Sequence, residues 1–198
     1  MRNYTIVKKP ENLDWSKVPV APIDNHLWLE PANIACTAQV CYDETAMYVR
    51  MTAKEQNIRA EETELLGMPC LDSCLEFFFR PFENSMRYIN IELNPNCCMW
   101  LGYRNKENKL IRIEEPSSIL DAKAVRTEDG WEVTYRVPAA LIAKYFDGFK
   151  FESGKNLPAN FYKCGDLTVQ KHYIAWNIIE QETPAFHVPE WFGMTTFE

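Results

Sequence analysis

The residues that decide the fold read CLEFFFR at positions 74–80 and RYINIELN at positions 87–94. Apolar residues alternate along both stretches, which is the period of a β-strand with one face against a core. Each stretch is therefore predicted to be a strand with a core face and an outer face, and residues 97–104 continue the pattern. The core face then holds Leu75, Phe77, Phe79, Ile89, Ile91, Leu93 and Leu101.

The outer face of these strands combines carboxylate, amide and aromatic side chains. Its members are Glu76, Phe78, Arg80, Tyr88, Asn90, Glu92, Asn94 and Trp100. A sugar needs rings on which its C–H faces can pack, together with donors and acceptors for its hydroxyls. The pattern fits a sugar-binding face, and it also fits an ordinary solvated face with scattered rings.

Further strand patterns extend this reading over most of the chain. Pro138 begins the one predicted helix, at 138–146, because proline suits a first helical position. We therefore predict an all-β fold, an antiparallel, jelly-roll-like β-sandwich with one short helix, as a single domain over residues 1–198. The additional strands are predicted at 34–42, 46–53, 119–126 and 131–137.

Charge and composition limit the partners of the chain. It has 198 residues with 21 basic and 28 acidic side chains, a formal net charge of -7, and no basic run. Such a chain is repelled by phosphates and by anionic lipid, so the sequence predicts no nucleic-acid partner and no membrane. A neutral or amino sugar, or an oligosaccharide of such sugars, fits the charge better.

The N-terminal residues and the cysteines together predict a compartment. The chain starts MRNYT and has no apolar stretch of the kind a signal peptide needs. Its seven cysteines are an odd number in irregular positions, including the adjacent pair Cys97 and Cys98. Reduced thiols suit this pattern better than a disulfide framework, so we expect a cytoplasmic location.

Six segments of the chain form a recognisable series. They are YDETAMYVR at 42–50, DSCLEFF at 72–78, IELNP at 91–95, GWEV at 130–133 leading to Val137-Pro138, NF at 160–161 with WN at 176–177, and FHVPEWFG at 186–193. In this order they resemble carbohydrate-binding module family 9, within the sandwich group that includes DOMON domains. The resemblance covers the chain from about Asp14 and implies a β-sandwich that binds glycans or sugars as an accessory to carbohydrate catabolism.

The resemblance also implies binding residues. Glu76 stands where members of the family hold the sugar with a carboxylate, and Tyr162 stands at a third polar position. At a second position, where basic side chains occur in the family, this chain has Glu92. The two clamp tryptophans correspond to Cys70 and Phe186, so one ring is lost and the other changed. With the outer-face pattern, the predicted ligand-binding residues are Glu76, Tyr88, Asn90, Glu92, Trp100, Tyr162, Phe186 and His187.

Two of these residues have a second interpretation as catalysts. Glu76 and Glu92 fit the acid and the base or nucleophile of a glycoside hydrolase, which needs two carboxylates roughly 5–10 Å apart.

His187 fits either a hydrogen bond to the ligand or an anchor for the C-terminal loop. The tryptophans Trp131 and Trp176 are expected in the core.

Metal and haem chemistry is the remaining alternative. Cys70, Cys74, Cys97, Cys98, Cys164 and His172 are candidate zinc ligands, but no close Cys-x-x-Cys or His-x-x-x-His pair occurs among them. DOMON relatives hold haem through His and Met, and His172 and His187 are the candidates here. Some family members also bind calcium. No dense acidic loop reproduces a calcium signature, so the sequence assigns no certain cofactor and leaves calcium as an open alternative.

Overall fold

The computed structural model describes all residues from 1 to 198. Strands make up 41% of the chain, and α1 (Ala139–Tyr145) is its one α-helix, so the prediction of a mostly β fold with one short helix is confirmed. None of the helices has the length and the apolarity that crossing a bilayer requires.

Most of the strands predicted from alternation are present, within a few residues of the expected bounds. They are β4 (Ala35–Tyr42), β5 (Ala46–Lys54), β6 (Cys74–Phe79), β7 (Ile89–Leu93), β8 (Met99–Arg104), β10 (Lys123–Thr127) and β11 (Gly130–Pro138). The largest error lies at 119–126, where a 3-10 turn at Ser117–Leu120 occupies the first residues. The strands that were not predicted are β1 (Asn3–Lys8), β2 (Ala21–Ile23), β3 (Asn25–His26), β9 (Leu110–Arg112), β12 (Asn156–Gly165), β13 (His172–Ala175) and β14 (Gly193–Phe197).

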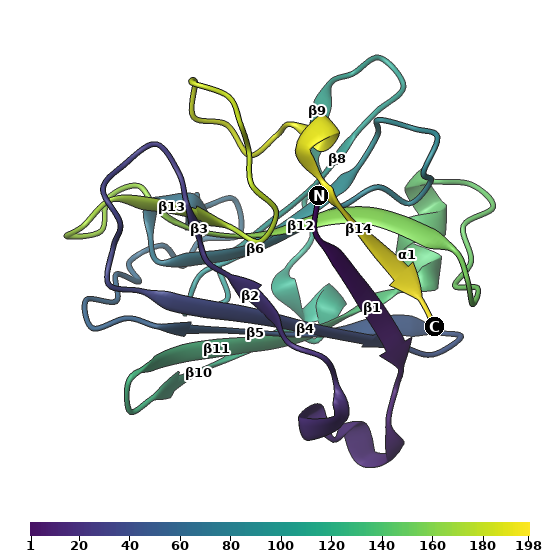
Figure 1. Ribbon diagram of the computed structural model, residues 1–198, viewed down its shortest axis with the longest axis horizontal. Helices are drawn as coiled ribbons and strands as arrows, with labels where there is room; N and C mark the ends of the chain where they lie inside the picture. The colour runs from purple at the N-terminus through teal and green to yellow at the C-terminus, as the bar shows by residue number, and fades with distance from the viewer.

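The strands form one hydrogen-bonded sheet that curls into two layers, in the order β10-β11-β5-β4-β1-β14-β12-β6-β7-β8-β9. Figure 1 shows β10, β11, β5 and β4 in the lower layer and β6, β12 and β13 in the upper layer. β2 extends the lower layer by pairing with β4, while β13 pairs with β12 and β3 in the upper layer. The two layers enclose the main core, as the prediction of a sandwich requires.

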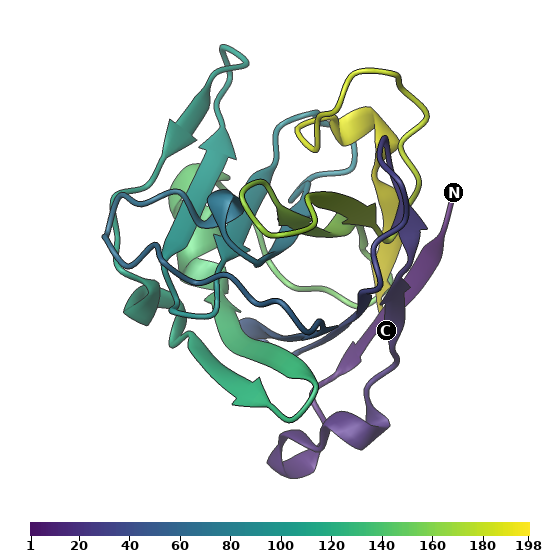
Figure 2. The same cartoon turned by 90° about the vertical axis from the view of Figure 1, so that its left-hand side faces the viewer.

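The N-terminal strand β1 joins the two layers and corrects the prediction of a purely antiparallel sheet. Its residues 3–6 pair in parallel with β14, and its residues 7–8 pair in parallel with β4. In the side view of Figure 2, the purple β1 runs beside the yellow β14. The sheet is therefore mixed and curled, and the jelly-roll arrangement is not confirmed.

The core between the layers confirms the strand register predicted from the sequence. All seven residues assigned to the core face are buried there, and Trp131 and Trp176 join them. Because a shift of one residue would exchange the two faces, this places Glu76, Phe78, Tyr88, Asn90 and Glu92 on the outer face.

The outer face of the upper layer is buried as well, which corrects the alternative of a solvated face. A second apolar cluster covers it, formed by Leu27, Cys74, Phe78, Tyr88, Tyr162, Cys164, Ala175, Ile179, Phe186 and Phe192. The segment between β13 and β14 supplies Ile179, Phe186 and Phe192 to this cover. Glu76 and Glu92 are only 3% and 6% exposed beneath it.

Candidate functional site

A cavity of about 240 Å³ opens on the outer face of the upper layer. Its floor comes from β6, β7, β8 and β12, and its rim from the segments before β6 and before β14. We call this cavity the outer-face pocket. It is lined by Met68, Cys70, Glu76, Glu92, Trp100, Leu110, Cys164, Asp166, Tyr173, Phe186 and His187.

Two glutamates stand side by side on the pocket floor, because Glu76 of β6 pairs directly with Glu92 of β7. Asn90 Nδ2 donates to Glu92 Oε1 at 2.8 Å, and Cys164 Sγ donates to Glu76 Oε1 at 2.9 Å. Burial raises the pKa of Glu92 to about 7. Burial and the charge of Glu92 raise the pKa of Glu76 well above its usual value. Burial therefore favours the protonated form of both acids, so the pair combines carboxyl donor capacity with carboxylate acceptors.

No basic side chain forms an ion pair with either glutamate of the pocket. The charge of Arg112 acts on Glu92, but its guanidinium donates to the carbonyls of Leu66, Gly67 and Met99. It also lies over the Trp100 ring, 4.2 Å from the centroid. Arg112 thus fixes Trp100 at the pocket edge and leaves the two acids free for a ligand.

Phe186 forms the aromatic wall of the pocket, and Tyr162 holds it in place. The two rings stack with centroids 4.1 Å apart and planes 6° from parallel. The Tyr162 hydroxyl also donates to the Phe186 carbonyl at 3.3 Å. Tyr162 is fully buried, so it positions the wall from behind while Phe186 faces the cavity.

His187 lies next to this wall and is oriented by a short chain of hydrogen bonds. Arg104 Nη2 donates to the Tyr88 hydroxyl at 3.0 Å, and this hydroxyl shares a hydrogen bond of 2.7 Å with His187 Nδ1. Burial and the charge of Arg104 lower the pKa of His187 to about 4, which keeps the ring neutral. The neutral imidazole has one N–H donor and one acceptor nitrogen, and it lines the pocket.

Two polar atoms beside the pocket have no partner in the protein. They are the buried Trp100 Nε1 and Asn90 Oδ1. Both lie next to Gly102, where an added Cβ would come within 2.9 Å of Trp100 Nε1 and 2.7 Å of Asn90 Oδ1. The absence of a side chain at Gly102 makes room for this pair, which stays buried without a hydrogen-bond partner.

The structure brings the eight predicted binding residues together in two groups. Glu76, Glu92, Trp100, Phe186 and His187 line the outer-face pocket. The other three, Tyr88, Asn90 and Tyr162, are completely buried and contact lining residues from behind.

A family comparison agrees with this geometry. A model described as carbohydrate-binding family 9 matches residues 7–197. The chain belongs to carbohydrate-binding family 9. No match was found among curated proteins.

Solved structures share the fold of this family 9 chain. A Bacteroides uniformis protein described as a putative carbohydrate-binding protein is 23% identical, with a TM-score of 0.86 over 100% of this chain and 99% of its own. A family 9 module from Caldicellulosiruptor kristjanssonii in complex with cellotriose is 12% identical, with a TM-score of 0.69 over 100% and 94% of the two chains. A complex of a module from the same organism with glucose gives 13% identity and a TM-score of 0.70 over 100% and 96%.

Several lining residues of the family 9 pocket were missed from the sequence. Leu110, Asp166 and Tyr173 belong to β9 or to the segment from the end of β12 into β13, none of which was predicted as a strand. In β13 the run HYIA at 172–175 is too short for alternation to distinguish it from a loop. Cys70, at the position of the lost clamp ring, does line the pocket.

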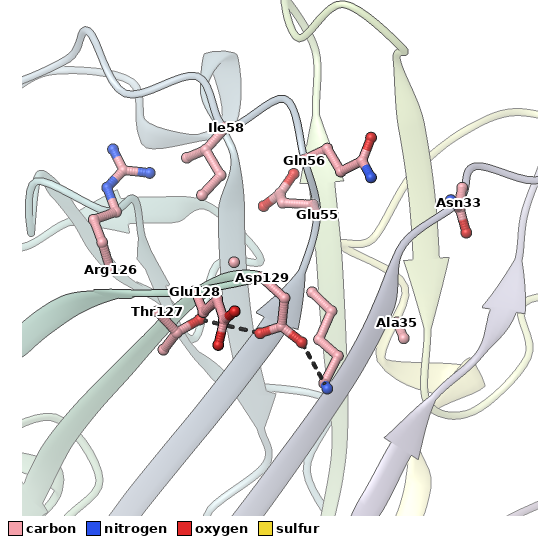
Figure 3. A pocket seen from close by; sticks show the side chains of 11 residues that line it. Asn33, Ala35, Glu55, Gln56, Ile58, Arg126, Thr127, Glu128 and Asp129 are labelled. Carbon is pink, nitrogen blue, oxygen red and sulfur yellow. Dashed lines mark hydrogen bonds and ion pairs between the residues drawn. The ribbon is translucent and has the colours of Figure 1, made fainter.

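A larger hollow, of about 920 Å³, lies at the other end of the family 9 domain, between β5 and the β10–β11 turn. Figure 3 shows its side chains: Glu55 points into it, and the ion pair between Lys54 and Asp129, 2.7 Å long, lies along it. None of its lining residues is aromatic. It therefore offers no ring on which a sugar could pack, and we assign it no ligand.

Beneath this hollow lies a buried network of charges, formed by Glu55, Lys163 and His172. Lys163 Nζ lies 3.2 Å from Glu55 Oε1 and donates to His172 Nε2 at 2.7 Å. Glu55 also accepts from Trp131 Nε1 at 2.6 Å and from the Ser73 hydroxyl at 3.1 Å. Burial and the charge of Lys163 lower the pKa of His172 to about 4. Every charged group of this network has its partners.

The metal and haem alternatives can be compared with this structure. Both ring nitrogens of His172 are occupied, by Lys163 and by the Gln170 carbonyl, so His172 does not fit an axial haem ligand. Of the predicted zinc candidates, only Cys74 and Cys164 come together, and Glu76 joins them. Two of these three ligands are sulfur atoms, which calcium does not favour, so this group does not fit calcium.

Proposed function

We propose that this family 9 chain is a non-catalytic domain, spanning residues 1–198, that binds a neutral or amino sugar in the outer-face pocket. One observation carries the proposal: the Phe186 ring stands beside the paired acids Glu76 and Glu92. The ring offers a surface for sugar C–H groups, while the acids offer hydrogen bonds to hydroxyls.

The size of the pocket favours a single sugar unit or the end of a chain. Its volume of about 240 Å³ is below the roughly 300–1,000 Å³ that sites for drug-sized molecules enclose. Haem is larger than such molecules and does not fit the pocket by the same measure. A longer oligosaccharide would extend past the rim, where Met68 is 40% exposed.

Charge favours neutral and amino sugars over acidic ones. Glu76 and Glu92 have no basic partner in the pocket, so the carboxylate of a uronic acid would meet like charge there. The ammonium group of an amino sugar would instead find carboxylate oxygens as acceptors, and its charge would favour the ionised form of the acids. Selectivity against uronates is therefore part of the proposal.

The arrangement of the acids supports binding over hydrolysis. Glycosidases place their two carboxylates on either side of the bond that breaks. Here Glu76 and Glu92 are neighbours on one wall, and each already has a hydrogen-bond partner in the protein. A role in carbohydrate catabolism, as an accessory to enzymes that cut glycans, and a cytoplasmic location complete the proposal.

Calorimetric titration of the full chain with glucose, glucosamine, glucuronate and cellotriose tests this function. We expect binding of the neutral or amino sugars, and weaker or no binding of glucuronate. Phe186→Ala removes the aromatic wall and should weaken binding roughly tenfold. Glu76→Gln removes one acid and should weaken binding by a similar or larger factor.

Matched controls show whether such losses are local to the pocket. Phe82→Ala removes a ring that packs near Phe146, outside the pocket, and Glu128→Gln removes an acid from the larger hollow. Both variants should bind sugar like the unmodified chain. Tight glucuronate binding, binding that survives both pocket variants, or turnover of aryl glycosides lost in Glu76→Gln would contradict the proposal.

A further inference from the structure

Cys74, Cys164 and Glu76 converge at the floor of the outer-face pocket although Cys164 lies far from the other two in the sequence. Cys74 and Cys164 are directly opposite each other on the antiparallel strands β6 and β12. Glu76 follows two residues after Cys74, and therefore points to the same face. The two Sγ atoms and a carboxylate oxygen of Glu76 all lie within 4.8 Å of one another, and all three residues are buried.

These atoms have the chemistry and the spacing of a zinc site. Thiolates with a carboxylate suit a borderline-soft cation such as Zn²⁺. At the usual Zn–S and Zn–O lengths, ligand atoms on a tetrahedron lie about 3.6–3.8 Å apart. The group therefore needs only small side-chain adjustments to surround an ion, and no movement of the backbone.

The surroundings of the group leave one side of such an ion open. Glu76 and Cys164 both line the cavity, whereas Cys74 lies below them. Three protein ligands leave a fourth tetrahedral position for a water or a hydroxyl group. Glu92, Cys70 and Asp166 line the same pocket and add further acidic or polarisable groups to it.

We propose that Cys74, Cys164 and Glu76 bind a Zn²⁺ ion at the floor of the pocket, with its fourth coordination position open to the ligand of the pocket. The two thiolates balance the charge of the ion, and the ion gives Glu76 a positively charged partner that no basic side chain provides. A sugar hydroxyl replaces the water on the ion and binds more tightly to the zinc-loaded protein. This last step rests on the proposed sugar binding, whereas the metal site does not.

Loading the site releases protons in a defined way. Burial raises the pKa of Cys74 to about 12, and the hydrogen bond with Cys74, together with burial, raises that of Cys164 well above its usual value. Both thiols are therefore protonated in the metal-free protein. The ion takes the place of the two thiol protons and of any proton held by Glu76, and these protons pass to the solvent.

Titration of the reduced, chelator-treated full chain with Zn²⁺ tests the metal site. We expect one equivalent to bind with a sub-micromolar Kd, and Co²⁺ in its place to give the absorption of a tetrahedral thiolate complex. Cys74→Ala and Cys164→Ala should each weaken Zn²⁺ binding at least 100-fold. Cys36→Ala, a matched control at a buried thiol of the main core, should leave binding unchanged.

The results separate the metal site from the sugar site. No stoichiometric Zn²⁺ binding, no thiolate absorption with Co²⁺, or equal binding by the Cys74→Ala/Cys164→Ala double variant would overturn the zinc site. The spectrum of the unmodified chain decides this even where a variant fails to fold. Sugar titrations with and without Zn²⁺ then test the link: tighter binding with Zn²⁺ supports it, equal binding overturns it, and absence of sugar binding in both forms contradicts the proposed function alone.

Discussion

Two buried clusters of charged groups lie on opposite faces of strand β12. They differ in how many of their polar atoms have hydrogen-bond or ion-pair partners within the protein. In the network of Glu55, Lys163 and His172, a lysine stands between an acid and a neutral imidazole. In the outer-face pocket, Glu76 and Glu92 face each other without a basic partner. Consecutive residues of β12 belong to the two clusters, because Lys163 points toward the main core and Cys164 toward the pocket.

The difference shows how a buried polar group can be assigned to stability or to function. Lys163 Nζ has three acceptors, namely Glu55, His172 and the Cys164 carbonyl, so its ammonium group is satisfied within the protein. In the pocket, the pKa of each acid is raised, and Trp100 Nε1 and Asn90 Oδ1 have no partner. The first cluster holds the fold together, and the second has capacity left for a ligand.

Replacing Lys163 should have the largest effect, because it tests whether the network of Glu55, Lys163 and His172 stabilises the fold. Lys163→Met leaves the Glu55 carboxylate buried without its cation and should destabilise the fold by about 3–5 kcal/mol. The measurement is the free energy of unfolding in denaturant. Lys163→Met combined with Glu55→Gln removes both charges and should recover part of the loss, because no unpaired charge is left buried. A loss below about 1 kcal/mol in the single variant, the range of an exposed ion pair, would show that the network is not structural.

Filling the space at Gly102 perturbs the pocket cluster alone. Gly102→Ala places a methyl group against Asn90 Oδ1 and Trp100 Nε1, so it should destabilise the fold by about 1–3 kcal/mol through overpacking. It should also weaken sugar binding, because Trp100 and the hydrogen bond from Asn90 to Glu92 must shift. Unfolding and sugar titration together check both effects. Unchanged sugar affinity in a destabilised variant would remove Trp100 from the binding wall.

The pH dependence of the folding stability should have opposite signs for the two clusters, and the effect should be smaller than those above. The folded-state pKa of His172, about 4, lies below its usual 6.5, so its contribution to stability is lost as the pH falls through this range. The folded-state pKa of Glu92, about 7, lies above its usual 4.5, so its contribution is present below pH 4.5 and is lost as the pH rises toward 7.

The two terms therefore oppose each other between pH 4.5 and 6.5. With chelator present, His172→Asn should flatten the loss of stability on acidification, and Glu92→Gln should steepen it. Denaturant unfolding at several pH values measures both slopes. If both variants change the slope in the same direction, the two clusters do not differ in the way described above.

The sequence was sufficient to predict those strands whose apolar and polar residues alternate. Leu75, Phe77, Ile89 and Ile91 point to the main core as predicted, and this register placed Glu76 and Glu92 together. Strand β12 escaped prediction because its run NLPANFYKCG is buried on both faces and contains a proline, so it does not alternate.

The parts of the site that depend on distant strand pairing could not be read from the sequence. The pairing of Cys164 with Cys74 follows from the position of β12 beside β6, and no local motif marks it. The burial of the outer face depends on the loop that carries Ile179 and Phe186, whose path the alternation of the strands beneath it does not specify.

The position of β1 between the two layers has a consequence for the order of folding. Its residues 3–6 pair with residues 194–197 of β14, so nearly the whole chain separates the two partners. On the ribosome, β1 must wait for β14 before its pairing is complete. Contacts of such long sequence separation slow folding and leave a strand edge exposed in the meantime. The two layers are therefore joined only after residues 194–197 have been synthesised, and β1 is the segment that needs protection from aggregation until then.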